Sequence, residues 1–308
     1  MPDAATLARW LDPEIRAYVA RCDSLFPEAA AAPSPAESRV FYDRLAAAFR
    51  APRPPGLAVR DAPPLRRYRP AAMRHAAVLL FVHGGGFVLG GLESHDDICA
   101  DLAAGAGLEV VAVDYRLAPD HPWPAALDDV QAAYAVLRAE GRPVVVGGDS
   151  AGGNLAAALC HRLHRLGEPP PRGQLLIYAG LSANPLRVAG RREADAPMLT
   201  ARECVHFLRL YAGTADPTGN PELAPLEATD FAGLPPAALF AAGYDPVRQD
   251  MEDYAAALLA AGQPVRYRAD PGLVHGWLRA RHSARLAAAA FTAVVEAAGA
   301  LAAGAITA

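Results

Sequence analysis

One serine stands between two glycines, directly after a short apolar run. Ser150 lies in the motif at 148–152 (GDSAG), which follows the β-branched residues 144–146 and precedes a helix-forming segment at 154–159. A strand, a sharp turn and a helix make the nucleophile elbow of a hydrolase, in which glycines permit the tight turn and the serine oxygen stands clear of the backbone. The pattern predicts that Ser150 is a nucleophile at the carboxyl edge of a sheet.

A serine hydroxyl needs a base to take its proton, and the base needs a third group to orient it. In hydrolases of this kind the order along the chain is Ser, then Asp or Glu, then His. Asp245 follows the apolar run 237–243, and His275 lies in a loop 30 residues further on, again after a strand-like segment. Both the order and the placement predict Asp245 as the acid and His275 as the base.

Other acidic residues and histidines compete for these roles. Asp250 and Asp253 follow Asp245 closely, but we expect them to lie inside a helix at about 247–261 and to point away from the strand end. His161 and His164 share one predicted helix and suggest a metal site. Because no third ligand stands at a suitable spacing, we interpret them as a solvated helix face.

A glycine-rich segment follows the predicted strand at 76–82. Residues 83–87 read HGGGF, and Leu89 occupies the position where a dinucleotide fingerprint needs its last glycine. Consecutive glycines leave backbone N–H groups unshielded. Together with the N–H of Ala151, they predict an oxyanion hole for a tetrahedral intermediate. A simple glycine-rich turn is the alternative.

The composition narrows the classes of function. The chain has 308 residues, a net charge of −4 and 53% hydrophobic residues, and all 29 of its positive residues are arginine. Without lysine, a P-loop lysine, a Schiff-base lysine and a Ser-x-x-Lys nucleophile are all excluded. We also find no basic stripe with interleaved aromatic residues, so we expect no nucleic-acid partner.

The cysteines and the two ends of the chain indicate the compartment. The four cysteines are scattered, and we expect them to be small buried residues in a reducing environment; they are Cys22, Cys99, Cys160 and Cys204. The first residues lack a basic and apolar signal pattern, and the alanine-rich tail at 286–308 is too weakly apolar for a membrane span. We therefore expect a cytoplasmic protein without a membrane span.

Short apolar runs alternate with helical patterns along most of the chain. This rhythm is typical of a parallel sheet covered on both faces, and so of an α/β fold. The predicted strands lie at 57–60, 65–68, 76–82, 109–113, 144–147, 174–178, 237–243 and 265–268. Ser94 and Asp97 resemble a capping box that opens a helix to about Ala106, and a helix is also predicted at 125–139.

Two segments interrupt this alternation. Residues 1–48 carry two short amphipathic helices, at 14–25 and 37–49, separated by an alanine- and proline-rich stretch at 29–35. Residues 183–226 contain a loop and then a helix at 200–211, which Thr200 and Glu203 open with a capping box. We interpret both segments as a cap over the carboxyl edge of the sheet, with ordinary surface helices as the alternative.

Taken together, the motifs resemble the bacterial hormone-sensitive-lipase family of esterases. The resemblance runs from about Phe81 to Trp277 and is carried by HGGG, by GDSAGG, by YRLAPDHPWPAA at 115–126, and by LPPA at 234–237 leading to DPV at 245–247. It implies an α/β-hydrolase fold with an eight-stranded, mostly parallel sheet and a helical cap. The catalytic domain would comprise residues 49–182 and 227–308, and the cap residues 1–48 and 183–226.

The resemblance also implies a role for each matching position. The nucleophile, acid and base positions are Ser150, Asp245 and His275, and the backbone oxyanion donors are Gly84, Gly85 and Ala151. His83 and residues 115–129 match positions that brace the active-site loops. Two positions depart from the family pattern: Gln249 replaces an acidic residue, and Ala179 replaces a proline.

The expected function is that of a carboxylic ester hydrolase without a cofactor, acting on small esters of short to medium acyl chain length. Phe207, Leu208 and Tyr211 either line its apolar pocket or form the core of the cap. The same three catalytic residues also serve amide, carbamate and lactone hydrolases and acyltransferases. A ligand-binding protein on a hydrolase scaffold is the alternative from another class. The sequence leaves open whether the chain is a monomer or a homodimer.

Overall fold

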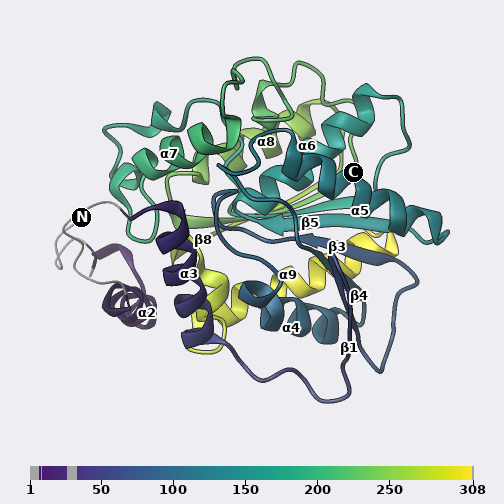
Figure 1. The fold of residues 1–308 in the computed structure, drawn as a ribbon, viewed down its shortest axis with the longest axis horizontal. Helices are drawn as coiled ribbons and strands as arrows, with labels where there is room; N and C mark the ends of the chain where they lie inside the picture. Colours follow the sequence, from purple (N-terminus) through teal and green to yellow (C-terminus); the bar gives the residue numbers. More distant parts are fainter. Residues whose placement is uncertain (1–6, 8, 26–32, 307–308) are drawn as a thin grey trace.

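A single eight-stranded sheet forms the centre of the computed structural model, which describes residue 7, residues 9–25 and residues 33–306 (Figure 1). The strand order is β1-β2-β4-β3-β5-β6-β7-β8. The pairs β1·β2 and β2·β4 are antiparallel and the other pairs are parallel. The strands are β1 (Ala58–Ala62), β2 (Leu65–Arg69), β3 (Val78–Val82), β4 (Glu109–Val113), β5 (Val144–Asp149), β6 (Gly173–Ile177), β7 (Ala237–Tyr244) and β8 (Val265–Val274). The predicted fold class is therefore confirmed.

Helices cover both faces of the sheet, so its central strands are buried throughout. Every residue of β3, β4 and β5 is buried, as their continuous apolar and β-branched sequences require. One face carries α4 (Asp96–Ala106) and α9 (Arg285–Ala303), and the other carries α5 (Ala125–Ala139), α6 (Ala151–Arg165) and α8 (Arg248–Ala260) (Figure 1). The two faces correspond to two hydrophobic clusters, one on each side of the sheet.

The tail was expected to be too weakly apolar for a membrane span, but its helix, α9, is long and apolar enough to cross a membrane by length and composition alone. Its alanine-rich face is instead buried in the core, where Ala290, Val294 and Ala297 are fully enclosed. It packs against β5, β6, β7 and β8. This burial identifies α9 as a core helix of the described fold.

Three helices lie at the left of Figure 1, with α7 above and with α3 and α2 below it. They are α2 (Pro13–Ser24), α3 (Pro35–Phe49) and α7 (Ala201–Ala212), close to the predicted bounds. The capping box of Thr200 and Glu203 is present at the start of α7. The greater part of the predicted alanine- and proline-rich break, residues 29–32, lies outside the described residues.

Two sequence predictions about local structure need correction. Ser94 does not cap a helix: it lies in a 3-10 turn, η1 (Glu93–His95), and its hydroxyl bonds with the backbone of Gly91, so α4 begins at Asp96. Strand β8 runs on to Val274, six residues beyond its predicted end. The remaining 3-10 turns are η2 (Pro185–Val188), η3 (Arg192–Asp195), η4 (Pro225–Glu227) and η5 (Trp277–Ala280).

Candidate active site

Ser150 occupies a strained turn between β5 and α6. Its backbone has φ +52° and ψ −121°, a conformation that residues other than glycine rarely adopt. Its N–H donates to Ile177 O at 2.8 Å. The turn is possible because the flanking residues are glycines. A Cβ at Gly148 or at Gly152 would lie 2.2 or 2.0 Å from Val82 O, far inside contact distance. The two glycines therefore allow the turn that holds the serine hydroxyl clear of the backbone, as a nucleophile elbow requires.

The structure brings the three predicted catalytic residues together. His275 Nε2 lies 2.8 Å from Ser150 Oγ, and His275 Nδ1 lies 2.8 Å from Asp245 Oδ2. Asp245 follows β7 and is fully buried, and its other oxygen accepts the N–H of Val247 at 3.1 Å. Since His275 follows β8, all three side chains meet at the carboxyl edge of the parallel strands. The arrangement is a nucleophile bonded to a base, and a base bonded to an orienting carboxylate.

Tyr178 supports the imidazole and was not predicted as a site residue. Its ring lies 4.8 Å from the ring of His275, and its hydroxyl lies 3.3 Å from Asp149 Oδ2. Like Ser150, it has a positive φ, of +36°, and it comes directly after β6. A polar aromatic residue at the end of a central strand was the only sequence signal for this role.

The glycine-rich loop is held by the carboxylate that precedes the serine. Gly84 N–H donates to Asp149 Oδ1 at 2.9 Å, and a Cβ at Gly84 would lie 2.6 Å from the same carboxylate. Gly84 was predicted as an oxyanion donor, but its N–H is taken by this bond. Gly85 and Gly86 line the pocket beside Ser150, and among the described residues their N–H groups have no acceptor. The N–H of Ala151, at the start of α6, likewise points to no protein acceptor there.

Asp149 lies in a closed network of polar side chains. Besides Gly84, it faces His95, with 3.2 Å between Oδ1 and Nε2, and the Tyr178 hydroxyl. Burial alone would raise the pKa of its carboxyl, but the charges of His95 and Arg279 and the hydrogen bonds from His95 and Gly84 together lower this pKa to about 2. Asp149 is therefore ionised at neutral pH.

His83 braces the loop from the other side. Its ring stacks on Tyr115 with 4.2 Å between the ring centroids, the Tyr115 hydroxyl donates to His83 O at 2.9 Å, and its own Nδ1 lies 3.0 Å from Gly84 O. Burial, and then the neighbouring His95, lower the pKa of His83 to about 3, so its ring is neutral. Further along, Arg116 and Asp129 form a bidentate pair, which ties the ends of the segment 115–129 together. These contacts agree with the bracing role that the resemblance implies.

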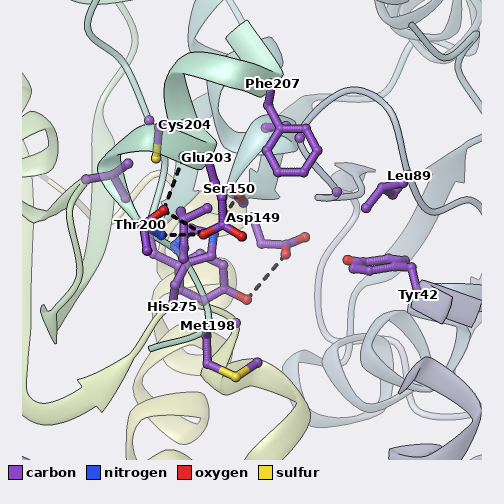
Figure 2. Close-up of a pocket in the computed structure, with 18 of the residues that line it drawn as sticks. Tyr42, Leu89, Asp149, Ser150, Met198, Thr200, Glu203, Cys204, Phe207 and His275 are labelled. Atoms are coloured by element: carbon purple, nitrogen blue, oxygen red, sulfur yellow. Dashed lines mark hydrogen bonds between the residues drawn. The ribbon is translucent and has the colours of Figure 1, made fainter. Parts of the chain in front are cut away.

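A pocket of about 590 Å³ opens beside Ser150 and His275. One arm extends beneath α2 and α3, where Tyr42 and Leu45 line it, and the other extends beneath α7, where Cys204, Phe207 and Leu208 line it. Figure 2 shows Phe207 and Cys204 on the α7 side and Tyr42 on the opposite side. Phe207 and Leu208 thus lie where a pocket lining was predicted, and Cys204 was missed.

Tyr211 does not line this pocket. It is fully buried, and its ring stacks on Phe87 with 3.9 Å between the centroids and 4° between the planes. Phe207 lies one turn earlier on α7, and its ring occupies the space where a Cβ at Gly86 would lie. Two aromatic side chains of α7 therefore pack onto the glycine-rich loop, and the prediction for Tyr211 changes from lining residue to loop support.

Asp250 is buried at the sheet edge rather than pointing away from it. Its carboxylate accepts the N–H groups of Leu181 and Ser182 and pairs with Arg187 at 2.6 Å. Asp253 pairs with the same arginine. The expected orientation of Asp250 was therefore wrong. Neither carboxylate bonds to His275, since Asp245 occupies that position.

Two further expectations concern histidine and cysteine. His161 is buried and lies 3.2 Å from the Tyr254 hydroxyl, so it is a core residue. His164 is exposed, so the predicted solvated face holds for it alone. Within the described residues there is no group of three or more His, Cys, Asp or Glu that could hold a metal.

The four cysteines are free, and Cys204 alone among them is only half-buried.

The two departures from the family pattern have local partners. The N–H of Ala179 lies 3.2 Å from Met251 Sδ, a contact that a proline could not make because it lacks the N–H. Gln249 donates to Asp253 and accepts from Arg191, each through its side-chain amide. Both positions are thus integrated into the structure without touching the catalytic residues.

The sequence profile of the family with the alpha/beta hydrolase fold matches residues 79–279. The chain belongs to this family. Esterase LipI of Mycobacterium tuberculosis is 44% identical over 211 residues, which make up 66% of this chain and 66% of LipI. The chain thus spans about two thirds of that relative's length. Ethyl acetate hydrolase of Pseudomonas putida is 35% identical over 70% of this chain and 71% of its own length.

Solved structures agree with this assignment over nearly the whole chain. An esterase from the bacterial hormone-sensitive lipase family superposes with a TM-score of 0.85 at 25% identity, covering 94% of this chain and 98% of that one. The resemblance predicted from the sequence motifs is therefore confirmed. Ester hydrolysis is the activity for which all three of these proteins are named.

Proposed function

We propose that this chain is a serine carboxylic ester hydrolase that works through an acyl-enzyme intermediate, without a cofactor. The observation that carries the proposal is the pair of 2.8 Å contacts that joins Ser150 to His275 and His275 to Asp245. Because this geometry occurs in a chain whose relatives are named as esterases, hydrolysis of small esters is the function that fits best.

The first half of the reaction forms the acyl-enzyme. Ser150 Oγ attacks the ester carbonyl carbon while its proton passes to His275 Nε2. Asp245 holds the Nδ1 proton of the imidazole and stabilises the imidazolium that forms. When the tetrahedral intermediate collapses, His275 gives its Nε2 proton to the leaving alcohol, and the acyl group remains on Ser150. Water then attacks this ester with His275 as the base, and the carboxylic acid is released.

Backbone N–H groups stabilise the negative oxygen of the tetrahedral intermediate. Gly85, Gly86 and Ala151 are the donors, because they adjoin Ser150 and have no protein acceptor in the described part of the chain. The Gly84 bond to Asp149 fixes the loop from behind. This assignment replaces the sequence-based set, which contained Gly84 in place of Gly86.

The substrates we propose are esters of short to medium acyl chain length, bound under a helical cap made of residues 1–48 and 183–226. Helices α2, α3 and α7 all contribute lining residues to the pocket, which supports the cap assignment. A volume of about 590 Å³ is in the usual range for a small-molecule site. The named substrate of the Pseudomonas putida relative, ethyl acetate, is a short ester. The four free cysteines fit a reducing cytoplasm.

The test is hydrolysis of p-nitrophenyl butyrate by the purified protein and by its Ser150→Ala variant. Ser283→Ala serves as the matched control, because its hydroxyl bonds only to Ala280 O, outside the pocket. We expect a loss of roughly five orders of magnitude in kcat for Ser150→Ala and none for Ser283→Ala. Equal activity in all three proteins would refute the assignment of Ser150. An inactive wild type that still binds esters would favour the ligand-binding alternative.

A further inference from the structure

A charged group lines the arm of the pocket beneath α2 and α3. Arg279 lies in η5, lines the pocket and is only 7% exposed. Pocket residues surround it: Tyr18 and Cys22 from α2, Tyr42 from α3, and Asp149 from the end of β5. An arginine is rarely buried to this extent unless each of its donors has a partner, because an unpaired polar group in the interior is destabilising.

One nitrogen of this guanidinium has no partner. Nη1 donates to Ser94 O at 2.8 Å, and the group lies over the ring of Tyr42 with 5.0 Å between Cζ and the centroid. Nη2 is buried and has no hydrogen-bond acceptor among the described residues. Of the neighbouring hydroxyls, Tyr18 donates to Gly276 O and Tyr178 donates to Asp149, whereas Tyr42 interacts with the guanidinium itself. Nη2 is therefore a guanidinium nitrogen that the described residues leave without an acceptor in hydrogen-bond geometry.

The charges in this arm decide which kind of acceptor fits. Asp149 is buried and ionised, and its charge offsets that of Arg279. A carboxylate brought in by the substrate would place a second buried negative charge near that of Asp149, and a cationic group would face Arg279 directly. A neutral oxygen accepts a hydrogen bond from the guanidinium and leaves the balance unchanged.

We propose that this arm binds the part of the substrate that carries a second, neutral oxygen acceptor, and that Arg279 donates a hydrogen bond to it. Suitable groups are a ketone, an ether or a second ester carbonyl, placed a few carbon atoms from the ester that Ser150 attacks. The inference rests on the proposed function and adds a substrate class to it. It predicts a preference for oxygenated esters over purely alkyl esters of the same size.

The experiment compares substrates that differ in one group. p-Nitrophenyl 4-oxopentanoate and p-nitrophenyl pentanoate place the extra carbonyl on the acyl side, and 4-oxopentyl butanoate and pentyl butanoate place it on the alcohol side. Each kcat/KM is divided by the rate of alkaline hydrolysis of the same ester, which removes differences in intrinsic reactivity. p-Nitrophenyl hemiglutarate, which has a terminal carboxylate, is measured beside the acyl pair.

The variants are Arg279→Met, which keeps the apolar stem without a donor, and Arg279→Gln, which keeps a neutral donor in case the first variant does not fold. Arg172→Met is the matched control, because Arg172 also donates to backbone carbonyls, those of Ala302 and Ala303, but lies outside the pocket. Melting temperatures are measured for all the proteins. A purely structural role of Arg279 would lower the rates for both members of a pair equally.

We expect the wild type to prefer the oxo ester about tenfold in one of the two series, which is the lower range for a hydrogen bond from a charged donor. The preference should fall to about one in Arg279→Met, fall in part in Arg279→Gln, and remain in Arg172→Met. A ratio near one for the wild type in both series, or a ratio that persists in both Arg279 variants, would overturn the inference. A preference for hemiglutarate over the oxo ester would overturn the charge argument. Failure of the proposed function is distinct, because then no alkyl ester would show turnover that depends on Ser150.

Discussion

Replacing Asp245 by asparagine tests the catalytic assignment more sharply than removing its side chain. Asparagine has the same shape, so it keeps the packing of this fully buried position. One oxygen of Asp245 accepts the Val247 N–H at 3.1 Å, and an asparagine oxygen would take over that bond. The amide NH₂ would then face His275 Nδ1, which now faces Asp245 Oδ2 at 2.8 Å. A donor in that place forces Nδ1 to act as an acceptor.

The consequence is the wrong tautomer of the base. With Nδ1 accepting, the proton of the neutral imidazole sits on Nε2, which is the atom that must receive the Ser150 proton. The same substitution in a serine protease triad lowers kcat about 10⁴-fold, which corresponds to about 5.5 kcal/mol of activation free energy. We expect a loss of that order for Asp245→Asn, with KM for p-nitrophenyl butyrate changed much less.

Asp250→Asn is the matched control, because it is the same chemical change at a buried carboxylate five residues away. Asp250 bonds with Leu181, Ser182 and Arg187 and makes no bond to His275. We expect this variant to lose about 1–3 kcal/mol of unfolding free energy and less than about tenfold in kcat. The assay is kcat and KM at pH 7–8 together with urea unfolding of all three proteins. Comparable losses of kcat in the two variants, or a larger loss in Asp250→Asn, would refute the reasoning.

Three further predictions follow from the site. The carboxyl of Asp149 has its pKa lowered from 3.8 to about 2 in the folded protein, so it contributes about 2 kcal/mol of stability above about pH 4 that is lost as the pH falls below 2. About 1 kcal/mol of this is lost between pH 5 and pH 3, so urea unfolding at these two pH values should show a drop about 1 kcal/mol larger in the wild type than in Asp149→Asn. Tyr211→Leu removes the stack on Phe87 and should lower kcat about tenfold with little change in KM. Tyr211→Phe keeps the stacked ring and should leave kcat unchanged. Equal values of kcat in the two variants would contradict the loop-support role. Phe207→Ala and Leu208→Trp should shift the preferred acyl chain length in opposite directions, measured with p-nitrophenyl esters from acetate to octanoate, and an unchanged preference would show that neither side chain limits the acyl site.

The sequence was most informative where periodicity and glycine requirements act locally. All eight strands were expected near their true positions. The signal was clearest for β3 to β7, which are buried throughout and are largely apolar runs bounded by turns. The end of β8 was missed because its last residues, around Pro271 and Gly272, read as a loop, yet the strand continues through them to Val274, which pairs with Tyr244 of β7. Ser94 illustrates the opposite error: its spacing to Asp97 fits a capping box, but a 3-10 turn places its hydroxyl against Gly91 instead.

Within the site, chain order predicted which residues meet but not how each backbone group is used. Ser150, Asp245 and His275 came from order and placement, and the structure brings them together. The loss of Gly84 as a donor could not be read from the sequence, since it depends on the direction of one N–H towards Asp149 across 65 residues of chain. Likewise, the position of Tyr211 depends on how α7 packs against the loop, a tertiary contact that helix periodicity does not encode.

Asp149, the residue before the nucleophile, places a buried negative charge in this site, and the positive charge of Arg279 offsets it. By binding Gly84 N–H, Asp149 anchors the glycine loop, whose next residues, Gly85 and Gly86, line the pocket. Its negative charge, however, is buried close to where the oxyanion must form, and repulsion there would raise the barrier. The nearby cation of Arg279 offsets that charge while its Nη2 remains without a partner among the described residues. Removing the Arg279 charge should therefore slow hydrolysis of every ester to some degree, in addition to abolishing the selective gain for oxygenated ones. The ratio of paired substrates separates the two effects, because only the selective gain differs between members of a pair.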